Sequence, residues 1–238
     1  MTKIQFYGHP LAGLQGIDLA GRLIVIEGPD GVGRSTQTAL LREWLEANGF
    51  AVYSSGLKRS ELAARGIAEA KQGHTLGPTT LGLFYAADLF DRLEREIVPA
   101  LRAGFVVLTD RYVYSLMARE MVRGVDKDWL QSLYGCALVP DAVFYLRCQV
   151  EHLVPRVLGS RGFDFWESGI DYVGTSDYFE GYTQYQQQML DTFDAMSQEY
   201  GFTNIDATLG IRDTFLALKE GVSEIVAELK PSQAGETA

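Results

Sequence analysis

The 238-residue sequence contains little cysteine and no excess of basic charge. Its two cysteines, Cys136 and Cys148, lie twelve residues apart without a second pair, which excludes a disulfide framework and a zinc knuckle. Lysine and arginine number 21 against 31 aspartates and glutamates, so the net charge is −10. Such a chain has no basic field for the backbone of DNA or RNA, nor for an anionic membrane surface. We therefore expect neither a nucleic-acid polymer nor a membrane as a partner.

Long hydrophobic runs are also missing. The longest uncharged stretch, residues 73–87, contains three glycines, one proline and three threonines, whereas a membrane helix needs about 20 apolar residues. Near the N-terminus, Lys3 is followed by Tyr7-Gly-His-Pro10 instead of the apolar core of a signal peptide. Together with the sparse cysteines, these features predict a cytoplasmic protein.

What the sequence does contain is an alternation of strand and helix patterns, in a chain that is 47% apolar. Apolar residues recur at helical spacing, as in the predicted helices 35–48 and 79–102, the second of which should bend near its end at Pro99. Strands that alternate with helices predict an α/β fold, with a five-stranded parallel sheet covered by helices on both faces. Short runs rich in Val, Ile, Tyr and Phe predict the strands, at residues 23–27, 51–55, 105–110, 142–146 and 203–206.

The chain shows no internal repeat and no linker rich in Pro, Gly and Ser, so one compact domain is the simplest interpretation. Residues 1–21 have scattered glycines and little periodicity, and we predict a loose N-terminal extension there. Residues 22–230 form the predicted domain. Residues 231–238 are small and polar, which predicts a flexible tail.

The strongest motif is a glycine-rich loop between the first predicted strand and the first predicted helix. It reads Gly-Pro-Asp-Gly-Val-Gly-Arg-Ser-Thr over residues 28–36, which is a phosphate-binding loop in its expected context. Gly28, Gly31 and Gly33 let backbone N–H groups surround a polyphosphate, while the helix dipole and the Ser35 hydroxyl favour the anion and its magnesium ion. Arg34 stands where lysine is usual, and its planar guanidinium keeps the charge without reproducing lysine's point contact.

A second polar motif, Asp110-Arg111-Tyr112, follows the third predicted strand. In a parallel sheet this position lies at the carboxyl edge, beside the phosphate-binding loop, where ligands bind in such folds. Alone, the pair could also be a surface ion pair at the end of a strand. Next to the loop it favours a binding site.

Three motifs together resemble the thymidylate kinase family, which phosphorylates dTMP with MgATP. They are Gly-x-Asp-Gly-x-Gly-basic-Ser-Thr, a Tyr85-Ala-x-Asp88 helix segment and Asp-Arg-Tyr after a strand. The resemblance spans about residues 22–230 and is most specific in the loop and in Asp-Arg-Tyr. It implies a P-loop NTPase-type three-layer sandwich, a nucleoside monophosphate kinase of nucleotide biosynthesis, ATP and Mg²⁺ as cofactors, and nucleotides as partners. Whether the protein forms a homodimer is left open by the sequence.

The resemblance also implies roles at the donor end of the site. Asp30, Arg34, Arg111 and Arg161 would be catalytic, with Asp30 near the magnesium ion and the acceptor sugar. Ser35 and Asp110 would hold the metal. Arg156 and Arg161 fall in a lid of about residues 154–168, and we favour Arg161 as the arginine that closes over the donor phosphates. The implied ATP-binding residues are Gly28, Gly31, Val32, Gly33, Arg34, Ser35, Thr36 and Ala207, the last in a stretch that would pack on the adenine.

At the acceptor end the chain departs from the family pattern. Tyr85 takes the place of an aromatic residue that stacks on thymine, but Leu89 stands where an arginine normally donates to a thymine carbonyl. Leu116 and Arg119 replace a small polar residue and a tyrosine. We therefore expect weaker discrimination against other bases. The implied acceptor-binding residues are Asp30, Arg59, Tyr85, Leu89, Asp110, Arg111, Leu116 and Arg119, although Lys58 and Arg59 could also be mere solvated charges.

Three hypotheses follow. The leading one is an ATP-dependent kinase that converts dTMP to dTDP by direct in-line phosphoryl transfer, because such catalysis needs alignment and charge neutralisation, which the arginines supply. The second is a catalytically weak nucleotide-binding regulator, suggested by Arg34. The third is a kinase for a different nucleotide or small phosphorylated acceptor, suggested by Leu89, Leu116 and Arg119.

Overall fold

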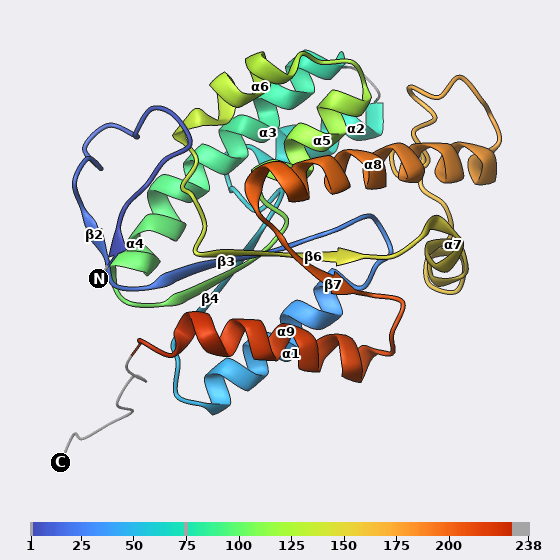
Figure 1. The fold of residues 1–238 in the computed structure, drawn as a ribbon. Coiled ribbons are helices and arrows are strands. Elements are labelled where there is room, and N and C mark those ends of the chain that lie inside the picture. The colour runs from blue at the N-terminus through green and yellow to red at the C-terminus, as the bar shows by residue number, and fades with distance from the viewer. Residues whose placement is uncertain (1, 74–75, 230–238) are drawn as a thin grey trace.

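The computed structural model describes residues 2–73 and 76–229, and within them five strands form one parallel sheet (Figure 1). The strand order across the sheet is β4-β5-β3-β6-β7. Each strand agrees with a predicted one to within one residue at either end, so the predicted α/β class is confirmed. The strands are β3 (Arg22–Glu27), β4 (Val52–Gly56), β5 (Val106–Asp110), β6 (Ala142–Arg147) and β7 (Thr203–Asp206).

Helices cover both faces of this sheet, which gives the three-layer P-loop NTPase-type sandwich (Figure 1). On β3, Leu23 and Val25 enter the core under α3, α5 and α8, whereas Ile24 and Ile26 enter the core shared with α1 and α9. The strand is therefore apolar throughout because both of its faces are buried. The helices are α1 (Arg34–Ala47), α2 (Ala64–Gly73), α3 (Pro78–Arg92), α4 (Val98–Arg102), α5 (Val113–Val122), α6 (Lys127–Leu133) with the 3₁₀ turn η2 (Tyr134–Cys136), α7 (Val150–Leu158), α8 (Tyr178–Tyr200) and α9 (Ile211–Val226).

The helix predicted over residues 79–102 is interrupted by a π-helical turn. This turn, η1 (Leu93–Ile97), joins α3 to α4, and the Val98 N–H donates to the Leu93 carbonyl five residues back. Pro99 follows directly, has no N–H to donate, and in a regular α-helix its ring would collide with the carbonyl four residues back. The helix predicted over residues 79–102 is therefore present except for the π-helical turn at residues 93–97, which directly precedes the segment of Pro99, where a bend was predicted.

The N-terminal residues, predicted as a loose extension, pack against the domain. Phe6 forms a β-bridge with Leu138, and the hydroxyl groups of Tyr7 and Tyr114 on α5 are hydrogen-bonded to each other. The apolar side chains around them pack against the core under α3, α5 and α8, which we call the upper core. An antiparallel pair, β1 (Thr2–Lys3) and β2 (Asp18–Leu19), closes this segment. The tail predicted over residues 231–238 lies outside the described residues.

Over the part of the chain that the structure describes, no helix is both long enough and apolar enough to span a membrane. Cys136 and Cys148 are free thiols there, as the sequence predicted.

Candidate functional site

A cavity of about 1250 Å³ opens at the carboxyl ends of β3, β4 and β5. Its walls come from the glycine-rich loop, the start of α1, helices α2, α3 and α5, and the segment that follows α7. Twelve of the predicted site residues line it, namely Asp30, Gly31, Gly33, Arg34, Ser35, Thr36, Arg59, Tyr85, Asp110, Arg111, Arg119 and Arg161. The structure thus brings both predicted ends of the site into one space.

The glycine-rich loop has the backbone that its sequence predicts. Gly31 has φ of 86° and Gly33 has φ of 102°, which are left-handed values that favour glycine. At Gly31 a side chain would also collide with Val157 of α7. Gly33 is the residue before α1, so the helix N-terminus and its unpaired N–H groups face the cavity. This end of the cavity is suited to a polyphosphate.

Arg34 lines the cavity, but its guanidinium is largely buried against the glycine-rich loop. Its guanidinium donates to the carbonyl oxygens of Gly28 and Pro29 and, through Nε, to Asp110 Oδ1 at 2.8 Å. The residue is 8% exposed. The side chain is therefore folded back on the loop and bonded to it and to Asp110.

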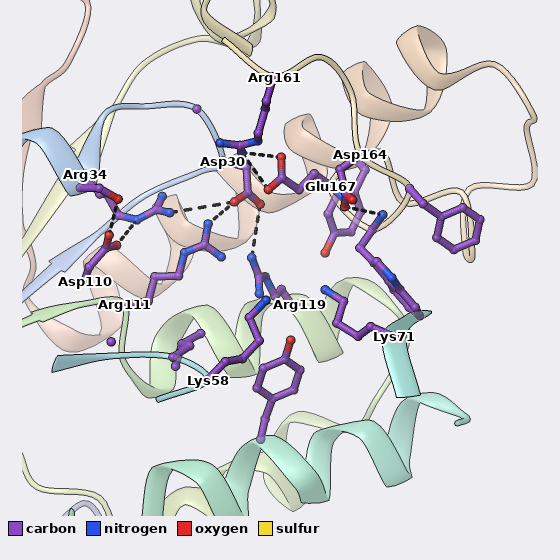
Figure 2. Close-up of a pocket in the computed structure, with 18 of the residues that line it drawn as sticks. Asp30, Arg34, Lys58, Lys71, Asp110, Arg111, Arg119, Arg161, Asp164 and Glu167 are labelled. Carbon is purple, nitrogen blue, oxygen red and sulfur yellow. Dashed lines mark hydrogen bonds and ion pairs between the residues drawn. The ribbon is translucent and has the colours of Figure 1, made fainter. Parts of the chain in front are cut away.

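Asp30 is the centre of a cluster of arginines (Figure 2). Arg111 donates to its Oδ1, Arg119 Nη2 lies 3.4 Å from its Oδ2, and Arg34 Nη2 lies 4.0 Å away. Burial alone would raise the pKa of the Asp30 carboxyl, but the charges of Arg111 and Arg34 outweigh it and lower that pKa. Asp30 is therefore ionised, and its negative charge offsets the mutual repulsion of the three arginines around it.

Arg111 owes its position to a buried residue that the sequence interpretation did not use. The backbone of Arg111 is left-handed, with φ of 75°, and its N–H donates to Ile26 at the end of β3. The next residue on β3, Glu27, is fully buried and accepts from the Tyr112 N–H at 2.8 Å and the Ser115 hydroxyl at 2.6 Å. Burial raises the pKa of Glu27 despite these bonds. In the sequence, the position of Glu27 at the end of an apolar strand was the one feature that could have indicated this role.

Lys58 and Arg59 are held by a second buried pair. Asp88 of α3 accepts from the N–H groups of Lys58 at 3.0 Å and Ser60 at 2.9 Å. It also pairs with Arg92 at 3.1 Å, and both side chains are fully buried. Lys58 itself has φ of 58°, so this loop is strained as well as fixed. Asp88 thus positions the arginine and lysine that face the cavity, a role its sequence position alone did not reveal.

Five predicted site residues lie away from the cavity wall within the described structure. Leu89 and Leu116, predicted to bind the acceptor, are buried in the upper core and are not among the residues that line the cavity. Val32 and Ala207 are buried in the core on the opposite face, although the Ala207 carbonyl accepts from Arg156 at 2.8 Å. Gly28 lies behind the loop, where a Cβ would be 2.7 Å from the Leu146 carbonyl oxygen. The apolar side chains of the other four residues therefore pack in the two cores.

The predicted lid begins within α7, which ends at residue 158, and continues as a loop over the cavity. Arg161 is paired with Glu167 of the same loop, at 2.6 and 2.8 Å (Figure 2). Lys71 of α2 lies 4.9 Å from the centre of the Trp166 ring, and burial lowers its pKa to about 8. The lid segment therefore contacts α2 across the cavity, and Arg161 lies above Asp30.

Ser35 and Asp110 lie together at the donor end. The Ser35 hydroxyl donates to Asp110 Oδ2 at 2.7 Å. Burial would raise the pKa of Asp110, but Arg34 and Arg111 lower it, so the carboxylate is ionised. No cluster of three or more acidic, histidine or cysteine side chains occurs among the described residues. One hydroxyl and one carboxylate suit Mg²⁺, which takes its other ligands from phosphates and water.

Comparisons with known proteins agree with this geometry. The family model described as Thymidylate kinase matches residues 26–214. A protein of Saccharolobus solfataricus named "Probable thymidylate kinase 2" is 37% identical over 210 residues, which cover 87% of this chain and 98% of the relative. A "Probable thymidylate kinase" of Thermococcus kodakarensis is 36% identical over a region that covers 56% of this chain and 70% of the relative. The "Thymidylate kinase" of Brachyspira hyodysenteriae is 30% identical, with 61% and 72% covered.

Proposed function

The chain belongs to the thymidylate kinase family, and we propose that it transfers the γ-phosphoryl group of ATP to dTMP, forming dTDP and ADP in one in-line step. The observation that carries this proposal is that one cavity joins the glycine-rich loop to Arg59, Arg111 and Tyr85. A polyphosphate at the loop and a nucleoside monophosphate at the other end would place donor and acceptor phosphates between the arginines. In phosphoryl transfer, such alignment and charge neutralisation supply most of the catalysis.

The chain's own residues divide this work. Arg34 and Arg161 would neutralise the donor phosphates, and Arg111 the acceptor phosphate, with Arg59 beside it. Asp30, ionised among three arginines, would keep them together while no phosphate is bound and orient Arg111 when one is. For Arg161 to reach a phosphate, its pairing with Glu167 must open. The Arg161 side chain is 53% exposed, so water can solvate the Glu167 carboxylate when Arg161 leaves it for a phosphate.

Ser35 and Asp110 would hold Mg²⁺, as their contact and the ionised carboxylate allow. When bound, the metal ion neutralises phosphate charge and orients the β- and γ-phosphates. Arg34 contacts the same carboxylate. Asp110 would therefore couple the metal position to the arginine of the loop.

We extend the proposal to the setting of the reaction. Two free thiols and an acidic chain support a cytoplasmic enzyme that acts on free nucleotides. Exposed Leu83 and Phe84 on α3 leave an apolar surface that supports a homodimer, which sedimentation would measure.

The direct test is a coupled ADP-release assay with MgATP and a panel of nucleoside monophosphates. We expect turnover that depends on the acceptor and is highest with dTMP. Binding of MgATP without acceptor-dependent ADP release would favour the regulator hypothesis instead. Turnover with another acceptor alone would favour a different kinase.

A further inference from the structure

A buried carboxyl group without a partner lies at the acceptor end of the cavity. Glu120 of α5 is 6% exposed and lines the cavity beside Arg119 and Tyr85. Its Oε2 atom has no hydrogen-bond partner among the described residues. A buried polar atom left in this way costs free energy, and in native proteins such atoms usually have a reason. A ligand that enters the cavity could supply the missing partner.

Two hydrogen-bond donors near Glu120, Arg123 and Tyr134, bind other groups. Arg123, three residues further along α5, donates to Asp171 at 2.8 and 3.0 Å and to the Tyr185 hydroxyl at 2.6 Å. The Tyr134 hydroxyl donates to the Gly82 carbonyl at 3.5 Å. These two donors are therefore bound elsewhere, and the Glu120 Oε2 atom has no partner of its own among the described residues.

Gly82 of α3 leaves room for the Glu120 carboxyl group. A Cβ at position 82 would lie 3.4 Å from Glu120 Cδ, so the group packs directly against the backbone of α3. Tyr85 follows one helical turn later and also lines the cavity. An aromatic ring and a carboxyl group thus stand together at the end of the cavity away from the glycine-rich loop.

The charge distribution orients an acceptor nucleotide. Its phosphate belongs with Arg59 and Arg111, near the loop, which directs its base toward Tyr85 and Glu120. A thymine base presents one N–H donor, at N3, between two carbonyl acceptors. The buried Leu89 and Leu116 offer no hydrogen bond to that edge.

We propose that the Glu120 carboxyl group accepts the N3–H hydrogen bond of the acceptor pyrimidine and so determines base specificity in this enzyme. The inference rests on the proposed function, because it assumes that a pyrimidine monophosphate occupies this end of the cavity. Burial raises the pKa of Glu120 to about 7, with Arg123 opposing and Asp171 adding to the shift. Either form keeps an oxygen lone pair for the N–H.

The test compares dTMP with 3-deaza-dTMP, in which a C–H replaces the N3–H, on the wild type and on Glu120→Gln and Glu120→Ala. We expect the wild type to prefer dTMP in kcat/KM by about 10- to 100-fold, the range for a lost hydrogen bond to a buried or charged group. Glu120→Gln keeps an amide oxygen and should keep most of that preference. Glu120→Ala should handle the two nucleotides within about threefold of each other, because a contact that is absent cannot discriminate. Glu43→Ala, on the exposed surface of α1, is the matched control.

A wild type that turns over both nucleotides equally, or a Glu120→Ala variant that keeps the wild-type preference, would overturn the inference. A merely structural role would lower both rates and leave their ratio unchanged. Since the wild-type ratio needs no variant, a misfolded variant does not remove the test. If the wild type failed to phosphorylate dTMP at all, the proposed function would fall, and this inference with it. If dTMP is turned over without dependence on N3–H, the role of Glu120 alone is wrong.

Discussion

The donor and acceptor ends of the cavity are built in different ways. At the donor end, a short continuous segment from Gly28 to Ser35 supplies backbone and side chains together. At the acceptor end, side chains from α3, α5 and the loop after β4 meet, and the buried Asp88 and Glu27 fix the backbone of that loop and of the residue before α5. The difference teaches that a phosphate site depends on local chain geometry, whereas an acceptor site depends on packing between distant segments.

Breaking the buried pair under the acceptor loop should have the largest effect. Asp88→Ala removes the acceptor for two loop N–H groups and leaves Arg92 buried without its partner. Loss of one member of such a pair costs about 3–5 kcal/mol of folding stability. Urea unfolding measures this change in the free energy of unfolding. Asp91→Ala, at a neighbouring and more exposed aspartate, serves for comparison. A loss below about 1 kcal/mol would contradict the role given to Asp88.

Removing Arg111 should affect acceptor use most strongly. We expect Arg111→Ala to lower kcat/KM for dTMP by about 100- to 1000-fold, as for other groups that stabilise developing charge. MgATP binding, measured by calorimetry, should change far less. Equal losses of acceptor use and ATP affinity would show that the two ends are not separate.

The pH dependence of stability should reveal the buried Glu120. Its pKa is raised from about 4.5 to about 7 in the folded protein, mainly by burial. The folded state therefore favours the protonated acid, and the wild type loses stability as pH rises from about 4.5 through about 7. Glu120→Gln has no such loss, so its stability relative to the wild type should increase over that window by up to about 3 kcal/mol. Urea unfolding at pH 5 and pH 8 measures the difference. A constant difference across that range would mean that the Glu120 pKa is not raised.

The smallest expected change is at the donor end, where lysine replaces arginine. Arg34→Ala should lose about 100-fold in kcat, because the loop then lacks its cation. Arg34→Lys should stay within about tenfold of the wild type, because the charge is kept while the contacts to Gly28, Pro29 and Asp110 are partly lost. Steady-state kinetics at saturating dTMP measures both. A large gain in rate for Arg34→Lys would indicate a native loop adapted to binding instead of turnover.

These two ends also differ in how far the sequence predicts them. The strands and the glycine-rich loop follow from local patterns, because apolar runs and positive φ values are properties of neighbouring residues. Glu27 and Asp88 were missed as positioning residues, because the N–H groups that they fix are distant in the sequence. Glu120 was missed because only the folded chain shows that its carboxyl group is buried at the cavity. Leu89 and Leu116, which the resemblance places beside the acceptor, lie in the upper core, because a match in sequence does not show which face of a helix packs inward.

The most direct test of the account is chromatographic analysis of the products formed from MgATP and dTMP. We predict equimolar ADP and dTDP, with a preference for dTMP over dUMP, UMP and dCMP of less than about a thousandfold, roughly 4 kcal/mol. We expect the preference to stay below this limit because Leu89 lies in the core and the Glu120 carboxyl group alone would form a hydrogen bond with the edge of the base. ADP without dTDP, or no reaction at millimolar nucleotide, would contradict the assignment of this cavity to phosphoryl transfer between the two nucleotides.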